Sequence, residues 1–502
     1  MENKINRITD ILRRDDGISG AMMYTEQISW ILFLKYLNDY EDLQRDEAEL
    51  DGKEYTYIID EKYRWSAWAC PKVDGKLDKI NAKSGDDLLV FVNGSRDSSE
   101  LGLFDYLRSF KSINEDFKSV RYKIGAIFEF IDNRIANGHT LREVLDLIDE
   151  MNFHSQADLF QLSLIYEKLL KDMGSDGGNS GEFYTPRPLI QMITTVVNPQ
   201  IGNTIYDPAA GSCGFLIEAY NHIRYTDNDA KTPRDLSTDQ LKFLREDTFF
   251  GNEKTPLSYV MGVMNMILHG IETPNIAKAN TLTRDIRAFE ETDRYDCILA
   301  NPPFGGKEKE QIQQNFPIQS NATELLFLQH MMKSLKLNGR CGVVIPEGVL
   351  FQTNNAFQAV KKDLLERFNV HTIVSLPSGV FLPYSGVKTN VIFFDRNGST
   401  SEIYYYEVNP ATKLTKNKPI QNEHFADFLA CVQTRKITAN SWIVNTNDIR
   451  DYDISAKNPN RAEAVAHVSP LELVKTIKAN NAQIDELMTE IEAILQGKNS
   501  HE

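Results

Sequence analysis

The stretch Tyr295-Asp296-Cys297-Ile298-Leu299-Ala300-Asn301-Pro302-Pro303-Phe304 carries the strongest structural signal in this chain of 502 residues. Its apolar first half predicts a buried parallel strand that ends in a tight turn. The two prolines remove two backbone donors and stiffen the chain, so the carbonyl oxygens become fixed acceptors beside the ring of Phe304. Such an edge suits a planar ligand group that carries an NH2. Because Asn-Pro is also a common loop opener, the motif alone leaves a purely structural turn open.

A loop of small residues follows another predicted strand upstream. Residues 203–206 predict the strand, residues 207–215 (Asp-Pro-Ala-Ala-Gly-Ser-Cys-Gly-Phe) form the loop, and a helical pattern begins at residue 216. Doubly wound sheets bind ligands at such strand-to-helix loops. The loop has no Gly-x-Gly-x-x-Gly and no phosphate-binding lysine, which favours a ligand without phosphate. S-adenosyl-L-methionine is such a ligand, and its ammonium and sulfonium groups make Asp207 a candidate contact.

Glu253 is a second acidic candidate for the same ligand. It follows residues 248–252, which predict the second strand of this unit. An acid at that position can bind both hydroxyls of a ribose. Alternatively, Glu253 complements the dipole of a helix that starts near Thr255 and Pro256. The presence of both loops favours the ribose contact.

Strand and helix patterns alternate from residue 181 to residue 397, with later strands at 340–346 and 389–394. The alternation predicts an α/β fold, with a Rossmann-like core whose mostly parallel sheet is flanked by helices. The predicted parts are a mainly helical domain (1–170), a Gly/Ser/Asp-rich linker (171–181), the core (182–400), a mixed extension (401–468) and a C-terminal helix (469–497). We expect the linker to be mobile and to become ordered when cofactor or DNA binds.

The C-terminal helix has a heptad pattern. Ser469-Pro470-Leu471-Glu472 predicts a capping box with proline at the first helical position, and Gly497 is a suitable stop. The two seam positions are Ile477, Ile484 and Ile491, and Leu473, Asn480, Leu487 and Ile494. A seam of this length is compatible with a coiled coil and equally with a helix packed on its own domain.

Composition limits the classes of protein that remain. Acidic residues outnumber basic ones by 71 to 55, giving a net charge of −16. Duplex affinity comes mostly from neutralised phosphates, so a lone DNA binder would need local basic clusters or a second subunit. Candidate clusters are Lys307 with Lys309, and Lys413 with Lys416 and Lys418, of which the second is better explained as solvated surface.

Other classes are excluded by missing patterns. Five scattered cysteines predict a reducing cytosol, and without Cys-x-x-Cys or His-Glu-x-x-His we expect no metal. The sequence contains no signal peptide and no apolar run long enough to span a membrane, so we expect a cytoplasmic protein.

The two loops, together with Gly181-Glu182-Phe183-Tyr184-Thr185-Pro186-Arg187-Pro188-Leu189, resemble the motifs of gamma-type DNA N6-adenine methyltransferases. More narrowly, they resemble the methylation subunit of type I restriction–modification systems. The resemblance is strong over residues 150–400 and weaker at both flanks. It implies S-adenosyl-L-methionine as cofactor and an adenine flipped out of double-stranded DNA as substrate. It also implies three protein partners: a specificity subunit that reads the sequence and binds the C-terminal helix, a second methylation subunit, and a restriction subunit.

The resemblance assigns roles residue by residue. Asn301, through its side chain, and Pro302, through its carbonyl, would accept hydrogen bonds from the adenine N6 amine; Pro303 would stiffen the turn and Phe304 would stack on the base. The implied cofactor contacts are Asp207, Ala209, Gly211, Ser212 and Gly214 in the loop, Glu253 at the ribose, and Tyr184, Thr185 and Pro186 over the methionine end. Thr185 also predicts a helix N-cap before Pro186.

One residue departs from the family pattern, and two other functions stay open. Asn280 stands where the family usually has an acid that contacts the cofactor's adenine, so its role is less certain. Protein glutamine N5-methyltransferases use a similar Asn-Pro-Pro-aromatic loop on a planar amide, although usually with tyrosine in the fourth position. A non-catalytic scaffold that kept the cofactor pocket is the other alternative, and the intact motifs argue against it.

Overall fold

The computed structural model describes residues 2–78, 80–95, 100–112, 116, 119–153, 166, 168–169, 185–227, 232–271, 273–382, 385–460 and 470–498. Residues 1–457 form one compact unit and residues 458–502 a second. The predicted linker at 171–181 and the predicted cofactor residue Tyr184 lie outside the described residues. Among the helices that are described, none combines the length and the apolar character that a membrane span requires.

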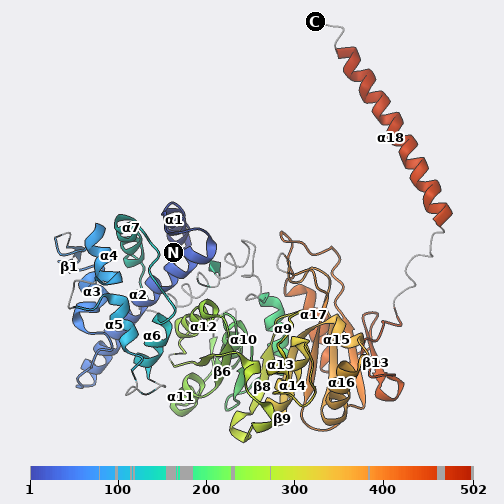
Figure 1. The fold of residues 1–502 in the computed structure, drawn as a ribbon, viewed down its shortest axis with the longest axis horizontal. Helices are drawn as coiled ribbons and strands as arrows, with labels where there is room; N and C mark the ends of the chain where they lie inside the picture. Colours follow the sequence, from blue (N-terminus) through green and yellow to red (C-terminus); the bar gives the residue numbers. More distant parts are fainter. Residues whose placement is uncertain are drawn as a thin grey trace. The chain divides into compact units, whose positions relative to one another are not determined.

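The N-terminal part is helical, as predicted. Its helices are α1 (Glu2–Leu12), α2 (Ala21–Leu50), α3 (Trp65–Trp68), α4 (Gly85–Asn93), α5 (Leu103–Ser109), α6 (Val120–Phe128) and α7 (Gly138–Asp149), blue to cyan in Figure 1. A short ribbon of β1 (Lys72–Val73) and β2 (Lys76–Leu77) joins α3 to α4. The run from Tyr24 to Leu37 in α2 is buried throughout, so α2 is the central helix of this domain.

A nine-stranded sheet forms the core of the catalytic region. In order across the sheet, the strands are β13 (Ser441–Asn445), β12 (Glu402–Glu407), β10 (Asn369–Ser375), β11 (Thr389–Asp395), β9 (Leu335–Pro346), β8 (Tyr295–Ala300), β3 (Ile205–Asp207), β6 (Phe249–Glu253) and β7 (Asn275–Lys278). Neighbours from β9 to β7 run parallel, whereas β11 is antiparallel to β9 and to β10. The predicted α/β fold with a mostly parallel sheet is confirmed.

Strand alternation separates two hydrophobic cores, one on each face of the sheet. In β8, Cys297 and Leu299 join one core and Ile298 and Ala300 the other, because successive side chains point to opposite faces. The first core contains residues of α9 (Arg187–Val197), α10 (Gly214–Arg224), α12 (Pro256–Leu268) and α17 (Glu423–Val432). The second contains residues of α14 (Thr323–Ser334), α15 (Glu347–Phe351) and α16 (Asn355–Arg367).

The first core continues into the N-terminal helices. It includes Ile28 and Ile31 of α2 as well as Met261 of α12. The Ser29 hydroxyl lies 3.4 Å from the Met261 sulfur. α12 therefore packs against α2 while it also supports the sheet.

Smaller elements complete the compact unit. They are α11 (Thr238–Glu246), α13 (Glu310–Gln313), the strands β4 (Tyr225–Asp227) and β5 (Thr232–Pro233), and short 3-10 turns at Glu61–Tyr63, Thr281–Thr283, Ile286–Ala288, Glu291–Asp293 and Thr446–Asp448. The sheet extends past residue 400, since β12 and β13 both belong to it. The domain limits drawn from the sequence stay a prediction.

The second unit contains one long helix, α18 (Pro470–Lys498). It begins at Pro470 as predicted, and it continues one residue beyond the expected stop at Gly497. Three side chains of the first predicted seam, Ile477, Ile484 and Ile491, are between 51% and 56% exposed. Leu487 of the other seam is 55% exposed, and Asn480 is exposed as well.

Candidate active site

The sheet order brings the predicted site residues to one edge. β8, β3, β6 and β7 are parallel neighbours, so their carboxyl ends lie side by side. Asn301 follows β8, Asp207 ends β3, Glu253 ends β6, and Asn280 comes two residues after β7. Residues that are almost 100 positions apart in the sequence thus meet where doubly wound sheets bind their ligands.

Asp207 is buried at the start of the small-residue loop. Its side chain is 1% exposed, and its Oδ1 accepts a hydrogen bond of 3.0 Å from the Ala209 amide. Burial raises the pKa of this carboxyl to about 8, with a further increase from the charge of Glu253. The ionised form of Asp207 is therefore costly in the free protein, and a cation beside it would stabilise that form.

Glu253 ties the same loop to the next helix. Its Oε2 accepts from the Gly211 amide at 2.9 Å, and its Oε1 accepts from the amide of Thr255 at 2.7 Å. Thr255 is the N-cap of α12, so Glu253 contacts the start of that helix, although it lies before the first turn. Each carboxylate oxygen has further lone pairs, which leaves Glu253 able to accept from a ligand hydroxyl.

The loop itself is closely packed against α12. Gly211 has φ of +51°, a conformation that side chains rarely adopt. A Cβ on Gly262 of α12 would lie 2.7 Å from both the Gly211 carbonyl oxygen and the Cys213 sulfur. Glycine at 262 therefore lets α12 approach the loop backbone, where Cys213 is a small, fully buried side chain.

The remaining loop residues support the backbone. The Ser212 carbonyl accepts from Asn265 Nδ2 at 2.9 Å, and the Gly214 carbonyl accepts from Arg187 at 3.2 Å. Ala209 contributes its amide to Asp207. Asn280 is half-buried, and its Oδ1 already accepts from the Leu282 amide at 3.1 Å. Any contact of Asn280 with an amine would have to share that oxygen.

The side-chain amide of Asn301 has a hydrogen bond at its nitrogen and, among the described residues, none at its oxygen. Its Nδ2 donates to Thr185 Oγ1 at 3.0 Å. Its Oδ1 is buried and has no hydrogen-bond partner among the described residues. Thr185 is therefore not the helix N-cap that the sequence predicted, because α9 begins at Arg187 with Pro186 in the cap position. The hydroxyl of Thr185 is used to orient Asn301 instead.

Phe304 lies half-buried at the end of the proline turn. Pro302 is buried and Pro303 exposed, as expected for a turn at a sheet edge. The Phe304 ring meets that of Phe381 edge to face, with 5.7 Å between centroids. Phe381 is the residue that the sequence analysis missed, although an aromatic next to Leu382-Pro383 in a strand-to-strand loop was a usable signal.

The turn after Phe304 is fixed by α14. The Gly305 amide donates to Glu324 Oε1 at 2.5 Å, and Gly305 has φ of +70°. A Cβ on Gly306 would overlap the Thr323 hydroxyl. Glycine is favoured at 305 by the positive φ, and at 306 because the turn lies directly on the first residue of α14.

The chemistry of the edge fits a cationic ligand with hydroxyl groups. Asp207 and Glu253 are 1% and 7% exposed, and neither forms an ion pair in the described part of the chain. Buried charges are normally paired, so two buried carboxyls without a basic partner call for a positive charge from a ligand. S-adenosyl-L-methionine carries two such charges and a ribose, which suits this donor set.

Comparison with known proteins assigns the family. A model of N-6 DNA methylases matches residues 156–468, which is more than half of the chain. The chain belongs to the N-6 DNA methylase family. A second model, described as the HsdM N-terminal domain, matches residues 1–159 of this methylase.

Individual relatives of the methylase agree with that assignment. The EcoEI methylase subunit of Escherichia coli is 35% identical over 510 aligned positions, covering 98% of this chain and 96% of the relative. The EcoKI methylase subunit of E. coli K12 is 28% identical, over 85% of this chain and 74% of the relative. A solved structure described in terms of complex assembly and conformational transition of the type I R-M system has a TM-score of 0.76 and 41% identity, covering 99% of this chain and 98% of that one.

The methylase is thus the modification subunit of a type I restriction–modification system and acts on adenine N6 in DNA. This result decides between the functions that the sequence left open. Protein glutamine methylation and a non-catalytic scaffold both give way to DNA methylation. The roles of single residues are a separate matter and follow below.

Proposed function

We propose that the chain methylates a flipped adenine through Asn301, using S-adenosyl-L-methionine bound at Asp207 and Glu253. The observation that carries this proposal is the Asn301 amide. Its nitrogen is held by Thr185 at 3.0 Å, while its oxygen is buried and unpaired among the described residues. A buried acceptor without a donor is costly, so an NH2 group from a substrate would supply the missing partner.

The protein's own contribution is positioning and preorganised electrostatics. Asn301 Oδ1 and the Pro302 carbonyl would accept from the N6 amine, which favours a pyramidal nitrogen whose lone pair is free to attack. The bound cofactor supplies an electrophilic methyl group on a sulfonium. Phe304, backed by Phe381, would stack on the base and offset part of the few kcal/mol that flipping costs. The methionine part of the cofactor is assigned to Asp207 and to the loop residues Ala209, Gly211, Ser212 and Gly214. Glu253 is assigned to the ribose, and Thr185 and Pro186 to the methionine end.

The charge of the chain and its exposed lysines indicate how it would bind DNA and why it would need partner subunits. Lys307 and Lys309 are exposed beside the catalytic turn and are placed to contact the DNA backbone. A net charge of −16 makes strong duplex binding by this chain alone difficult, so the proposal includes a separate specificity subunit. The complex would also contain a second modification subunit and the restriction subunit, and would act in the cytoplasm, where the DNA is.

α18 is the proposed contact with the specificity subunit. Val474, Ile477, Ile484, Met488 and Ile491 are each about half exposed along it. Single exposed apolar residues are common, but a continuous stripe at heptad spacing is typical of a helix that binds partner helices. Ile484→Glu together with Ile491→Glu should abolish co-purification with the specificity subunit, while Asp485→Lys on the same helix should retain it. Retention of the subunit by the double variant would contradict this contact.

The proposal for Asn301 is tested by Asn301→Ala. We expect methyl transfer to fall about 100- to 1,000-fold, by analogy with the removal of one preorganised hydrogen-bonding group in other enzymes. Tritium transfer to DNA at saturating cofactor measures the rate. Binding of the cofactor, followed by calorimetry, should be unchanged, because Asn301 is assigned to the base.

A matched control is Asn275→Ala at the amino end of β7. It also removes an asparagine side chain that donates a 2.7 Å hydrogen bond, to the Glu246 carbonyl. Activity should stay near the wild-type rate in this variant. Wild-type turnover by Asn301→Ala would contradict the assignment of the base-binding residue.

A further inference from the structure

Several buried polar side chains meet at one hydroxyl behind the cofactor loop. Tyr206 of β3 is 4% exposed, and its hydroxyl accepts from Asn252 Nδ2 at 2.9 Å. His330 of α14 places its Nε2 3.0 Å from the same oxygen. The Thr281 side chain lies close enough to lower the pKa of Tyr206. The Tyr206 ring is held in place by stacking on Tyr295, with 4.4 Å between centroids.

Three residues of this cluster are each adjacent in sequence to a residue that is proposed to contact the cofactor. Tyr206 precedes Asp207, Asn252 precedes Glu253, and Thr281 follows Asn280. Thr281 Oγ1 also donates to the Pro208 carbonyl at 2.5 Å, inside the cofactor loop. The Tyr206 hydroxyl therefore connects the end of β3 with the end of β6, and the bond from Thr281 ties the turn after β7 to the loop that follows β3.

The protonation of this cluster can be worked out from its hydrogen bonds. Burial lowers the pKa of His330 to about 3, so its imidazole is neutral. Burial likewise raises the pKa of Tyr206 well above its usual value, so the hydroxyl keeps its proton. His330 Nδ1 has no partner among the described residues, and a proton there would be a buried donor without an acceptor.

One arrangement avoids such a donor. His330 Nε2–H and Asn252 Nδ2–H both donate to the Tyr206 oxygen, and Thr281 donates to the Pro208 carbonyl. The hydroxyl of Tyr206 thus receives hydrogen bonds from two side chains that belong to different elements.

We infer that Tyr206 is a positioning residue whose hydroxyl sets the spacing of the two strand ends and the adjoining turn that present Asp207, Glu253 and Asn280. It does not touch the reacting atoms. Its effect is on cofactor affinity, because a ligand held by several strand ends binds tightly only when their spacing is fixed beforehand. This inference rests on the proposed function, which assigns those three residues to S-adenosyl-L-methionine.

Tyr206→Phe tests the inference in the full-length chain. Removing the hydroxyl leaves two buried donors without an acceptor, and we expect the Kd for S-adenosyl-L-methionine, measured by calorimetry, to rise about tenfold. The kcat at saturating cofactor and saturating DNA should stay within about twofold of wild type, because the Asn301 turn is fixed separately by Thr185 and Glu324. A general loss of stability would not produce this division between affinity and turnover.

Tyr405→Phe is the matched control. Tyr405 is 3% exposed, lies on β12, and donates its hydroxyl to the Ile454 carbonyl at 3.0 Å. Its removal should lower Tm to a similar extent and leave the Kd unchanged. A Kd for Tyr206→Phe within about twofold of wild type would overturn the inference, since one lost hydrogen bond is expected to exceed that.

His330 provides a second, independent comparison. His330→Gln keeps an N–H donor that can reach the Tyr206 oxygen, whereas His330→Leu removes it. The glutamine variant should bind the cofactor near the wild-type Kd and the leucine variant about tenfold more weakly. If Tyr206→Phe fails to fold, this pair decides, and equal Kd values for both variants overturn the inference. Failure of the wild-type chain itself to bind the cofactor would instead contradict the proposed function.

Discussion

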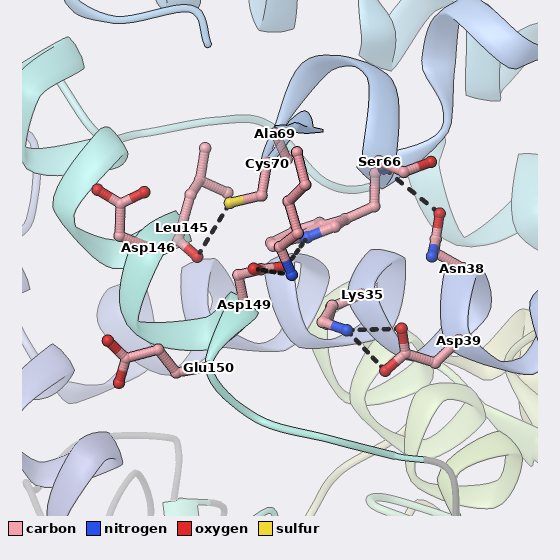
Figure 2. Close-up of polar contacts among 12 residues, drawn as sticks. Lys35, Asn38, Asp39, Ser66, Ala69, Cys70, Leu145, Asp146, Asp149 and Glu150 are labelled. Carbon is pink, nitrogen blue, oxygen red and sulfur yellow. Dashed lines mark hydrogen bonds and ion pairs between the residues drawn. The ribbon is translucent and has the colours of Figure 1, made fainter. Parts of the chain in front are cut away.

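Buried acidic residues have basic partners in the N-terminal domain but, among the described residues, none at the sheet edge. In α2, the Lys35 ammonium lies 2.5 and 2.6 Å from the two oxygens of Asp39, and both residues are almost fully buried (Figure 2). Nearby, Asp149 accepts from Trp65 at 2.8 Å and pairs with Lys72 at 2.7 Å. At the sheet edge, Asp207 and Glu253 are as deeply buried and have no basic partner among the described residues.

The difference separates polar groups that stabilise the fold from polar groups that bind a ligand in the proposed function. A buried pair satisfies itself and adds specificity to the packing of helices. A buried acid or amide oxygen that is supported by backbone amides alone retains the capacity to bind something else. The three predictions below test this distinction, beginning with the largest expected effect.

The largest effect is expected from breaking the pair in α2. Lys35→Met leaves Asp39 buried without a cation, and the N-terminal domain should lose about 3–5 kcal/mol of unfolding free energy. Trp30, Trp65 and Trp68 are three of the four tryptophans of the chain, so tryptophan fluorescence during urea unfolding reports mainly on this domain.

The double variant Lys35→Met, Asp39→Leu is the control for the broken pair. It removes both charges and should recover most of the lost stability, because the cost comes from the unpaired carboxylate. Equal unfolding midpoints for the single and the double variant would show that packing of the lysine side chain, rather than its charge, is what stabilises α2.

The second prediction concerns the sheet edge, where the ring of Phe304 is proposed to stack on the base. Phe304→Ala should reduce methyl transfer about 5- to 150-fold, because stacking of a base on an aromatic ring contributes about 1–3 kcal/mol. Cofactor affinity should not change, since the ring is assigned to the base. Steady-state transfer of label to DNA and calorimetry with the cofactor measure the two quantities.

Phe243→Ala, which truncates another half-buried ring on α11, serves as the control for general loosening of the fold. It should retain normal transfer. A large loss of cofactor affinity in Phe304→Ala would reassign that ring from the base to the cofactor.

The sequence predicted the location of the candidate site residues better than it predicted the residues that support them. β3, β6 and β8 were found because buried parallel strands are short apolar runs, and each ended at a residue type suited to the ligand. The prediction of Thr185 as a helix N-cap was wrong because a Thr-Pro pair is typical of a helix start, and only the fold shows that Asn301 lies 3.0 Å away. Phe381 and Tyr206 were missed because their importance comes from contacts with Phe304, Asn252 and His330, which are distant in the sequence.

β12, which pairs with the edge strand β13, was also difficult to predict for a physical reason. β12 contains three successive tyrosines, Tyr404, Tyr405 and Tyr406, which are buried on both faces of the sheet. Such a run lacks the alternation of polar and apolar residues that identifies a strand. Its hydroxyls find partners in Lys436, Ile454 and Asp427, contacts that the linear sequence does not indicate.

The smallest effect is expected in the pH dependence of the protein's stability, to which the carboxyl of Asp207 contributes. Its pKa rises from 3.8 in the unfolded chain to about 8 in the fold, so the folded state binds the proton more tightly. The stability that this group contributes is therefore complete below about pH 4 and is lost as the pH rises through about 8. Without cofactor, Tm of wild type should decline by a few degrees more than that of Asp207→Asn over this window. Differential scanning calorimetry at several pH values measures the two slopes.

The affinity for the cofactor should depend on pH in the opposite direction. A cation beside Asp207 favours the ionised carboxyl, so binding below about pH 8 must release a proton and becomes tighter as the pH rises. In Asp207→Asn the affinity should be weaker and nearly independent of pH, because the amide cannot ionise. Parallel Kd profiles for the two proteins would mean that Asp207 does not face the cation, and that the unpaired acid at the sheet edge has a structural role like that of Asp39 in α2.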